Sequence, residues 1–405
     1  MRKKISLEKA IEKCAELVRT IDDVEIIPVE HAYNRVVAQD LRALVDMPPF
    51  DTARMDGYTV GIDDLAKLER LSNEDSLSLK IVANLPAGSS GSIFPLVGQT
   101  VRIMTGALLP QGTAAIVKQE EVVREDESWV RVFGSVDYHN HIQKRGSVIN
   151  KGELLVRAGE MLDYNNLERL AATGNARLPV YRQPVVYIIN SGSELVLPGV
   201  PLSTGKIYNS NRSLFFAKLA REQCTVKTGP CPVLDKREEI CAEISHGLKV
   251  ADMVIITGGA ADGDYDLVPS ALAEIGAEFI YHGLLMQPGA KSSAAVKDGK
   301  LIINLPGNPW AGDILFEVLI VPVLNKVKGM KNWCTRWFEI TLEGDNLEPT
   351  DLRRMCRGEL RAGHDVSLVA GYLEKNQPCT GIRPLILDIQ PGQGHEGDII
   401  RALLI

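Results

Sequence analysis

Two glycine-rich turns in the C-terminal half constrain the fold of this chain more than any other feature. In each, an apolar run ends in small, turn-forming residues and a helical stretch follows. The first run is 253–257, followed by Gly258 and Gly259, and the second is 301–305, followed by Pro306-Gly307-Asn308. Glycine lets a backbone approach a ligand closely, and a helix N-terminus offers free N–H groups to an anion. The turns indicate a phosphorylated ligand, although either alone could be an ordinary strand-to-helix connection.

Strand and helix patterns alternate around these turns. Apolar runs predict strands at 184–190, 224–227, 253–257, near 279 and at 301–305, and helices are expected near 210–222, 235–249 and 267–275. Such alternation predicts a doubly wound, mainly parallel sheet. Its ligand should lie at the carboxyl ends of the strands, where a third polar turn, Ser191-Gly192-Ser193-Glu194, also falls.

The remaining segments predict further domains, since 405 residues exceed one core. An amphipathic helix is expected at 6–20 with Ser6 as its N-cap, short strands at 75–135, and a helix at 160–175. Residues 330–405 indicate a small barrel or sandwich. We therefore expect an α/β multidomain protein with four domains. They are an N-terminal helical and linker domain (1–45 with 142–176), a β-rich domain (46–141), the α/β domain (177–328) and a C-terminal β domain (329–405).

Composition excludes several classes of protein. The net charge of −7 argues against a general nucleic-acid binder. Seven scattered cysteines without a Cys-x-x-Cys pair favour reduced thiols over a zinc site. No signal-peptide core and no apolar stretch long enough for a membrane span are present. We expect a cytoplasmic protein that binds neither membrane nor nucleic acid.

Acidic residues recur in loops beside glycines, namely Asp56, Glu194, Asp264 and Asp266. Carboxylate oxygens suit Mg²⁺, which also holds substrate phosphates. Each residue alone could instead serve a turn or a helix cap. Thr105 follows a strand at 101–104, and a strand-ending turn is the favoured interpretation of its position.

The histidines offer no metal site. His139 and His141 are two residues apart and would share a strand face, but no third ligand lies nearby, so surface positions are expected. The sequence also contains no Gly-x-Ser-x-Gly elbow and no P-loop, so hydrolase and Walker-type NTPase interpretations lack their motifs.

Several motifs together resemble one family. The chain resembles the MoeA family, the molybdopterin molybdotransferases, and is similar to the E domain of gephyrin. The matching motifs, in order, are Met55-Asp56-Gly57-Tyr58, Arg102-Ile103-Met104-Thr105-Gly106-Ala107, Ser191-Gly192-Ser193-Glu194-Leu195, Thr257-Gly258-Gly259 with Gly263-Asp264-Tyr265-Asp266, and Leu305-Pro306-Gly307-Asn308-Pro309.

The resemblance implies an elongated homodimer in which a MogA-like α/β domain of one subunit faces the N-terminal part of the other. It implies Mg²⁺-dependent insertion of molybdate into adenylylated molybdopterin with release of AMP, and a possible MogA-like or molybdoenzyme partner. We also expect the helix at 6–20 to contribute to the dimer interface.

The resemblance carries roles to particular residues. Asp56, Glu194 and Asp266 fall on catalytic positions, and Glu194 and Asp266 would also hold the metal. The expected cofactor-binding residues are Thr105, Ser191, Gly258, Gly259, Asp264, Pro306, Gly307 and Asn308.

The chain also departs from the family at acidic and basic positions. Ser193 stands where Asp is usual, Gly146-Ser147-Val148-Ile149 where Gly-Glu-Asp-Ile is usual, and Gln287-Pro288-Gly289-Ala290-Lys291 where Lys-Pro-Gly-Lys-Pro is usual. Ala261 replaces a serine, Asn209 an aspartate and Ala53 a serine. Each lost charge-assisted contact costs about 1.5–3 kcal/mol. Two alternatives to an active enzyme therefore remain: a non-catalytic pterin-binding paralogue that acts as a carrier or partner, and an enzyme for another phosphorylated ligand.

Overall fold

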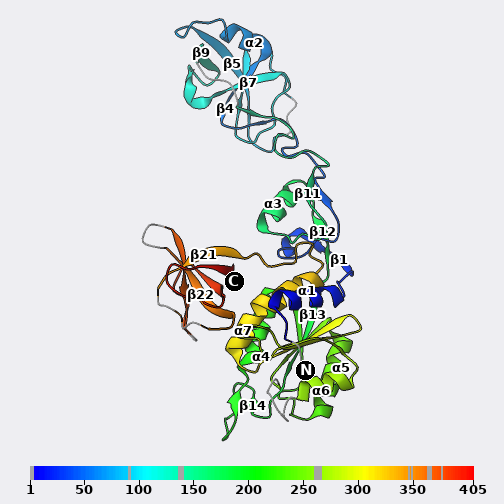
Figure 1. Cartoon of the computed structure of the whole chain (residues 1–405). Coiled ribbons are helices and arrows are strands. Elements are labelled where there is room, and N and C mark those ends of the chain that lie inside the picture. The colour runs from blue at the N-terminus through cyan, green and yellow to red at the C-terminus, as the bar shows by residue number, and fades with distance from the viewer. Residues whose placement is uncertain are drawn as a thin grey trace.

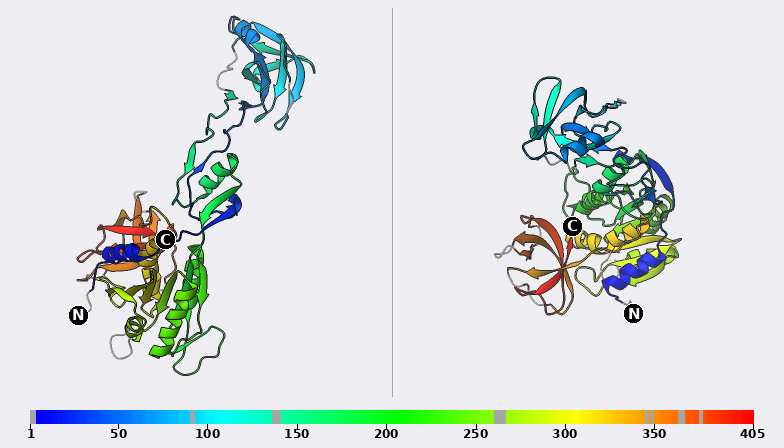
Figure 2. Two further views of the ribbon diagram at one scale, coloured as in Figure 1. Left: turned by 90° about the vertical axis from the view of Figure 1, so that its right-hand side faces the viewer. Right: turned by 90° about the horizontal axis from the view of Figure 1, so that it is seen from above.

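The computed structural model describes residues 4–89, 93–135, 141–259, 267–344, 347, 350–362, 367–374 and 377–405. Figure 1 shows an elongated molecule with a β-rich unit at one end and an α/β unit at the other. A short linker joins the two, and a C-terminal barrel lies beside the α/β unit, as both views of Figure 2 also show. No helix in the described ranges is long and apolar enough to cross a membrane.

The α/β unit is built on a six-stranded sheet in the order β16-β13-β17-β20-β19-β18. Strands β16, β13, β17 and β20 are parallel, and β19 runs antiparallel to both of its neighbours. The strands are β13 (Val185–Asn190), β16 (Thr225–Thr228), β17 (Met253–Thr257), β18 (Glu278–His282), β19 (Ser293–Lys297) and β20 (Lys300–Leu305). The predicted mainly parallel sheet is confirmed, while β19 was not predicted.

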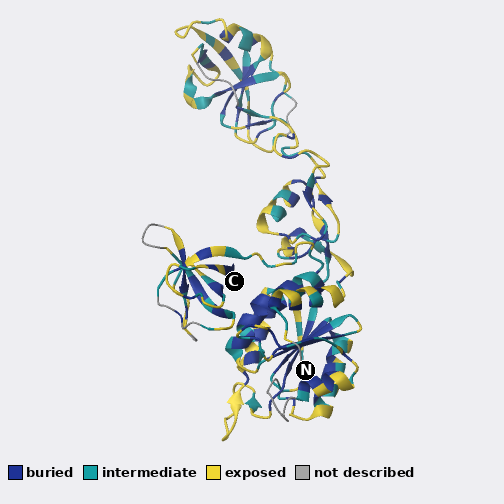
Figure 3. Cartoon of the chain, in the orientation of Figure 1, coloured by how far each residue is buried: buried dark blue, intermediate teal, exposed yellow. Residues whose placement is uncertain are grey.

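Helices cover both faces of this sheet. They are α4 (Ser210–Arg221), α5 (Arg237–Val250), α6 (Leu267–Glu274), α7 (Pro309–Leu315) and α8 (Val321–Val327), with a single π-helical turn at Phe316–Ile320 between the last two. Successive residues of the central strands enter opposite cores. Ile255 and Ile303 pack on one face with α4, α7 and α8, whereas Ile256 and Ile302 pack on the other with α5 and α6. Two-sided burial explains why these strands are continuously apolar, and Figure 3 shows the buried strands at the centre of the unit.

The predicted N-terminal helix is α1 (Leu7–Leu17), and the Ser6 hydroxyl accepts a hydrogen bond from the Lys9 N–H at 3.3 Å. Its apolar residues Leu7, Ala10 and Cys14 pack in the α/β core with α8. That apolar face is therefore used inside the chain. The expectation that this helix contributes part of a dimer interface stays a prediction, and such a contact would use the exposed face of α1.

The linker contains β1 (Val24–Pro28) paired antiparallel with β12 (Arg177–Tyr181), and β2 (Leu41–Arg42) paired with β11 (Leu154–Val156). Between them lies α3 (Tyr164–Ala172), which Asp163 and Asn166 cap reciprocally. The helix ends before Gly174, whose φ of 92° is in the left-handed region that favours glycine. A 3₁₀ turn (Val29–His31) follows β1.

The β-rich unit is a six-stranded sheet in the order β7-β4-β6-β5-β9-β8. Its strands are β4 (Gly57–Gly61), β5 (Ser76–Leu85), β6 (Gln99–Ile103), β7 (Thr113–Lys118), β8 (Val122–Arg124) and β9 (Trp129–Phe133). A 3₁₀ turn (Gln119–Glu121) follows β7, β3 (Thr52–Ala53) pairs with β10 (Ile142–Gln143), and the unpredicted α2 (Ile62–Leu68) follows β4.

The C-terminal strands close into a barrel in the order β21-β23-β22-β24-β25, which resolves the choice between barrel and sandwich. They are β21 (Phe338–Leu342), β22 (Arg354–Ala362), β23 (Leu368–Tyr372), β24 (Arg383–Ile389) and β25 (Ile399–Leu404). Gln287 of the α/β unit pairs with the start of β22, since its N–H donates to the Arg353 carbonyl and its carbonyl accepts from the Met355 N–H.

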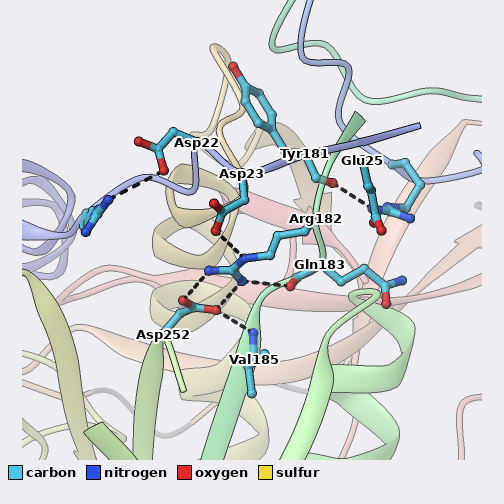
Figure 4. Close-up of polar contacts among 10 residues, drawn as sticks. Asp22, Asp23, Glu25, Tyr181, Arg182, Gln183, Val185 and Asp252 are labelled. Atoms are coloured by element: carbon cyan, nitrogen blue, oxygen red, sulfur yellow. Dashed lines mark hydrogen bonds and ion pairs between the residues drawn. The ribbon is translucent and has the colours of Figure 1, made fainter. Parts of the chain in front are cut away.

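The chain crosses twice between linker and α/β unit, and Arg182 joins the two crossings (Figure 4). Its guanidinium forms a bidentate pair with Asp252 at 2.7 and 2.8 Å and a third bond to Asp23 at 2.8 Å. Asp252 also accepts from the Val185 N–H at 2.8 Å. Although burial acts in the opposite direction, the Arg182 and Val185 bonds lower the pKa of Asp252 below its usual value.

Candidate functional site

The polar turns after β13, β17 and β20 lie side by side at one edge of the α/β sheet. These strands are adjacent and parallel, so their carboxyl ends coincide. The Ser191 N–H donates to the Thr257 carbonyl at 3.0 Å, and the Gly258 N–H donates to the Leu305 carbonyl at 3.2 Å. The structure therefore brings Ser191, Gly258 and the turn at Pro306 together, as the strand pattern predicted.

Gly258 can only be glycine in this arrangement. Its φ is 95°, and a Cβ atom there would lie 2.1 Å from the Ser191 carbonyl oxygen. Gly259 is also left-handed, and its Cβ would lie 2.8 Å from Val268 Cγ2. Both glycines thus keep the turn close to its neighbours, and they leave its backbone uncovered by side chains of their own.

Asp235 is part of this edge and was not predicted as a site residue. Its carboxylate accepts from the Ser191 hydroxyl at 3.1 Å and from the Ser193 N–H at 2.9 Å. In the sequence, Asp235 is the first residue of the helix predicted at 235–249, where an acidic residue is ordinary. In the structure α5 begins at Arg237 without a side-chain cap, so the carboxylate is free to bind the turn instead.

Glu194 lies on the same turn and is exposed. Its carboxylate folds back over Gly192, where a Cβ atom would lie 2.6 Å from Oε2. The Lys206 ammonium donates to the Ser193 carbonyl at 2.6 Å, which adds a cation beside the two carboxylates of Glu194 and Asp235. The edge therefore presents both signs of charge to solvent.

The second glycine turn is held by two asparagines. The Asn308 side chain accepts from the Trp310 N–H at 3.1 Å and caps α7, whose first residue is Pro309. The Asn211 amide, near the start of α4, donates to the Gly307 carbonyl at 2.8 Å. Gly307 and Asn308 are exposed, so the turn is rigid but open to a ligand.

Asp56 and Thr105 form a second group in the β-rich unit. Thr105 donates to Asp56 Oδ1 through its backbone N–H and its hydroxyl, each at 2.8 Å. These two bonds lower the pKa of Asp56, and the charge of Arg102 adds to them. Gly57 is required because a Cβ there would lie 2.1 Å from the Val117 carbonyl oxygen.

The α/β sheet edge and the group around Asp56 belong to units at opposite ends of the elongated molecule (Figure 1). Ser191, Glu194, Gly258, Gly259, Pro306, Gly307 and Asn308 belong to the α/β unit, whereas Asp56 and Thr105 belong to the β-rich unit. Asp264 and Asp266, the remaining predicted site residues, lie outside the described residues.

The carboxylates at this edge of the α/β sheet can be compared with the ligands that Mg²⁺ requires. Within the described ranges, no three His, Cys, Asp or Glu side chains converge as a metal-binding group. Mg²⁺ usually needs only one or two carboxylates together with phosphate oxygens and water. Glu194 and Asp235, both against the same turn, fit that requirement.

The substituted positions have ordinary surroundings. Val148 is 54% exposed. Asn209 caps α4 by accepting from the Arg212 N–H, and its amide donates to Cys231 Sγ at 3.0 Å.

The expectation of a surface position for His141 was wrong: this residue is buried, and its Nδ1 lies 2.8 Å from the Ile116 carbonyl oxygen. His139 lies outside the described residues.

Two segments of the chain match models of known families. Residues 5–174 match the MoeA N-terminal region (domains I and II). Residues 187–326 match a probable molybdopterin-binding domain.

Named relatives cover most of the chain. The molybdopterin molybdenumtransferase of Bacillus subtilis is 30% identical over 80% of this chain and 75% of its own length. The molybdopterin molybdenumtransferase of Nostoc is 31% identical over 77% and 71%, respectively. A crystal structure of the MoeA protein of Pyrococcus horikoshii is 28% identical, covers 99% of both chains and superposes with a TM-score of 0.77.

Proposed function

Because this chain belongs to the MoeA family of molybdopterin molybdenumtransferases, which functions in molybdenum cofactor biosynthesis, we propose that it transfers molybdenum to molybdopterin. The reaction proposed is insertion of molybdate into adenylylated molybdopterin with release of AMP. The observation that carries the proposal is the meeting of three turns at one sheet edge, with Gly258 against Ser191 and Asn308 capping α7. Backbone N–H groups at such an edge suit the phosphates of the ligand.

Each predicted residue receives a role in this proposal. Asp56, Glu194 and Asp266 are the catalytic residues. The residues that bind the phosphorylated ligand are Thr105, Ser191, Gly258, Gly259, Asp264, Pro306, Gly307 and Asn308, and Thr105 also holds Asp56 in place. Glu194 and Asp266 hold Mg²⁺, and we add Asp235 as a carboxylate beside them. When bound, Mg²⁺ would neutralise phosphate charge at the scissile phosphoanhydride.

A homodimer completes the site in this proposal. The β-rich unit, which carries Asp56, and the α/β unit, which carries Glu194, lie at opposite ends of the elongated molecule, so a cleft that uses both residues needs the β-rich unit of a second copy. Val24 and Ile26 of β1 are more than half exposed, which gives a second copy apolar surface to cover. Light scattering that shows a monomer at micromolar concentration would contradict this assembly.

The predicted domain limits remain part of the proposal. We assign 177–328 to molybdopterin binding, 46–141 to the unit that carries Asp56, 1–45 with 142–176 to the linker and 329–405 to the barrel. The proposed location is the cytoplasm, and a MogA-like protein or a molybdoenzyme is the proposed partner.

The direct test supplies purified protein with adenylylated molybdopterin, molybdate and Mg²⁺ and measures AMP. The proposal expects AMP release that depends on both molybdate and Mg²⁺. Ligand binding without AMP release would instead support a non-catalytic pterin-binding paralogue. The substitutions at Ser193, Val148 and Gln287 favour that alternative, whereas the Asp235 carboxylate beside Ser193 argues for an active site.

A further inference from the structure

Arg102 stands beside Asp56 without a full set of partners. It lies on β6 and is partly buried. Among the residues that the structure describes, its one hydrogen bond is long, from Nη2 to Gln119 Oε1 at 3.4 Å, and its buried Nε has no acceptor. Among the described residues no carboxylate lies within ion-pair distance of this guanidinium. A buried donor of a charged group without a partner calls for an explanation.

The surroundings link Arg102 to Asp56. The Gln119 N–H donates to the Asp56 carbonyl at 3.2 Å, so the residue that contacts Arg102 also holds the backbone of Asp56. Thr105 occupies only Oδ1 of Asp56, and no described residue hydrogen-bonds to Oδ2. Neither the Arg102 Nε nor the second carboxylate oxygen of Asp56 has a hydrogen-bond partner among the described residues, and the two residues are close enough for the charge of Arg102 to lower the pKa of Asp56.

We propose that Arg102 is a ligand-binding residue of the β-rich unit, whose guanidinium binds an anionic phosphate oxygen next to Asp56. This inference rests on the proposed function, which supplies a phosphoanhydride ligand. A carboxylate alone would repel such a ligand, whereas Arg102 offers the charge and the fork of donors that phosphate prefers. Asp56 Oδ2 then remains for a hydroxyl or a cation of the same ligand.

A structural role is the competing explanation. Glu121 Oε2 is buried near the same 3₁₀ turn and also has no partner, and Glu121 Oε1 is 3.4 Å from Lys118 Nζ. In this explanation Arg102 and Glu121 pair with each other, which would satisfy both buried atoms. In that case both residues would matter for stability and neither for ligand affinity.

The experiment measures binding of inorganic pyrophosphate with Mg²⁺ to the full chain by calorimetry. Arg102→Gln should weaken binding about tenfold or more, and Arg102→Lys, which keeps the charge, should recover part of it. Arg131→Gln is the matched control, because Arg131 lies in the same sheet and pairs with Glu125. Thermal unfolding of each variant, and of Glu121→Gln, is recorded in parallel.

Pyrophosphate affinity that is unchanged in Arg102→Gln overturns the inference, as does a wild type that binds no pyrophosphate. Equal losses of thermal stability in Arg102→Gln and Glu121→Gln, without a selective loss of affinity, assign a structural role and also overturn it. AMP release by the wild type judges the proposed function separately. Arg102-dependent pyrophosphate binding without AMP release would leave this inference standing and reject the proposed function.

Discussion

Asp235 is an exposed carboxylate whose two oxygens both bind the turn that carries Glu194. We predict that Asp235→Asn lowers AMP release at least tenfold, because the amide removes the negative charge and one of two acceptors. The free energy of unfolding should fall by about 1 kcal/mol, as for the loss of an ordinary hydrogen bond. AMP release and thermal unfolding are both measured, with Glu238→Gln on α5 as the control. Full activity in Asp235→Asn would remove Asp235 from the site.

Two substituted positions allow a gain-of-function test. We predict that Ser193→Asp combined with Val148→Asp raises AMP release, because both changes add carboxylates expected to strengthen Mg²⁺ binding. Val148 is 54% exposed, so a carboxylate there stays hydrated and its burial costs little. AMP release is measured against Mg²⁺ concentration. A wild type that already turns over at about 1 s⁻¹ or faster would make the missing acids dispensable.

At the scale of the element, β22 carries a carboxylate that makes the barrel sensitive to acid. Burial alone would raise the pKa of Glu359, but hydrogen bonds from the Gly381 N–H, Arg361 and the Thr380 N–H lower it from 4.5 to about 2. The folded chain therefore binds fewer protons than the unfolded chain between these values. The stabilisation is complete above about pH 4.5 and is lost as the pH falls toward 2.

We predict that Glu359→Gln lowers the unfolding temperature at pH 7 and that its difference from wild type shrinks near pH 2. Thermal unfolding at several pH values measures this. Glu374→Gln, at an exposed position after β23, should change little at either pH. A difference for Glu359→Gln that is constant across the pH range would show that the native carboxylate does not carry a lowered pKa.

Elements with a strong local pattern were predictable from the sequence, and those shaped by tertiary contacts were not. The apolar run at Met253–Thr257 became β17 without a change of bounds, because burial on both faces makes such a strand continuously apolar. Strand β19 (Ser293–Lys297) has small and polar residues and owes its conformation to its pairing with β18 and β20. Helix α2 directly follows β4, and its N-cap Gly61 has no side chain that could cap the helix, so the sequence carries no signal for where this helix begins.

The residues of the candidate site also fall into those that a local sequence pattern predicts and those that only tertiary contacts reveal. The glycine turns could be predicted from the sequence, because at Gly258 a Cβ atom would clash with the Ser191 carbonyl oxygen and only glycine fits. Asp235 could not be predicted as a site residue, because it is the first residue of the helix predicted at 235–249, where an Asp usually serves the helix N-terminus. The bond between Asp56 and Thr105 joins residues 49 positions apart, and no local rule predicts such a contact.

At the scale of the whole molecule, Arg182 ties the two crossings between linker and α/β unit. We predict that Arg182→Ala broadens the range of angles between these units, because Asp23 of the first crossing loses its partner and the second crossing loses its ion pair with Asp252 of the α/β unit. Small-angle scattering at one fixed oligomeric state measures this as a wider distribution of interatomic distances. Arg177→Ala is the control, since the Arg177 side chain donates to the Ile26 carbonyl within the linker. An unchanged distribution in Arg182→Ala would show that other contacts fix the angle.

The packing of α1 against α8 has a consequence for synthesis on the ribosome. Helix α1 is made first, yet its partner Val321–Val327 emerges only after the linker, the β-rich unit and most of the α/β unit have been translated. The β-rich unit has its own cores and can fold as soon as it leaves the exit tunnel. The partner of the first helix is therefore missing until nearly four-fifths of the protein has been made, and Leu7 and Cys14 cannot complete their native packing before then.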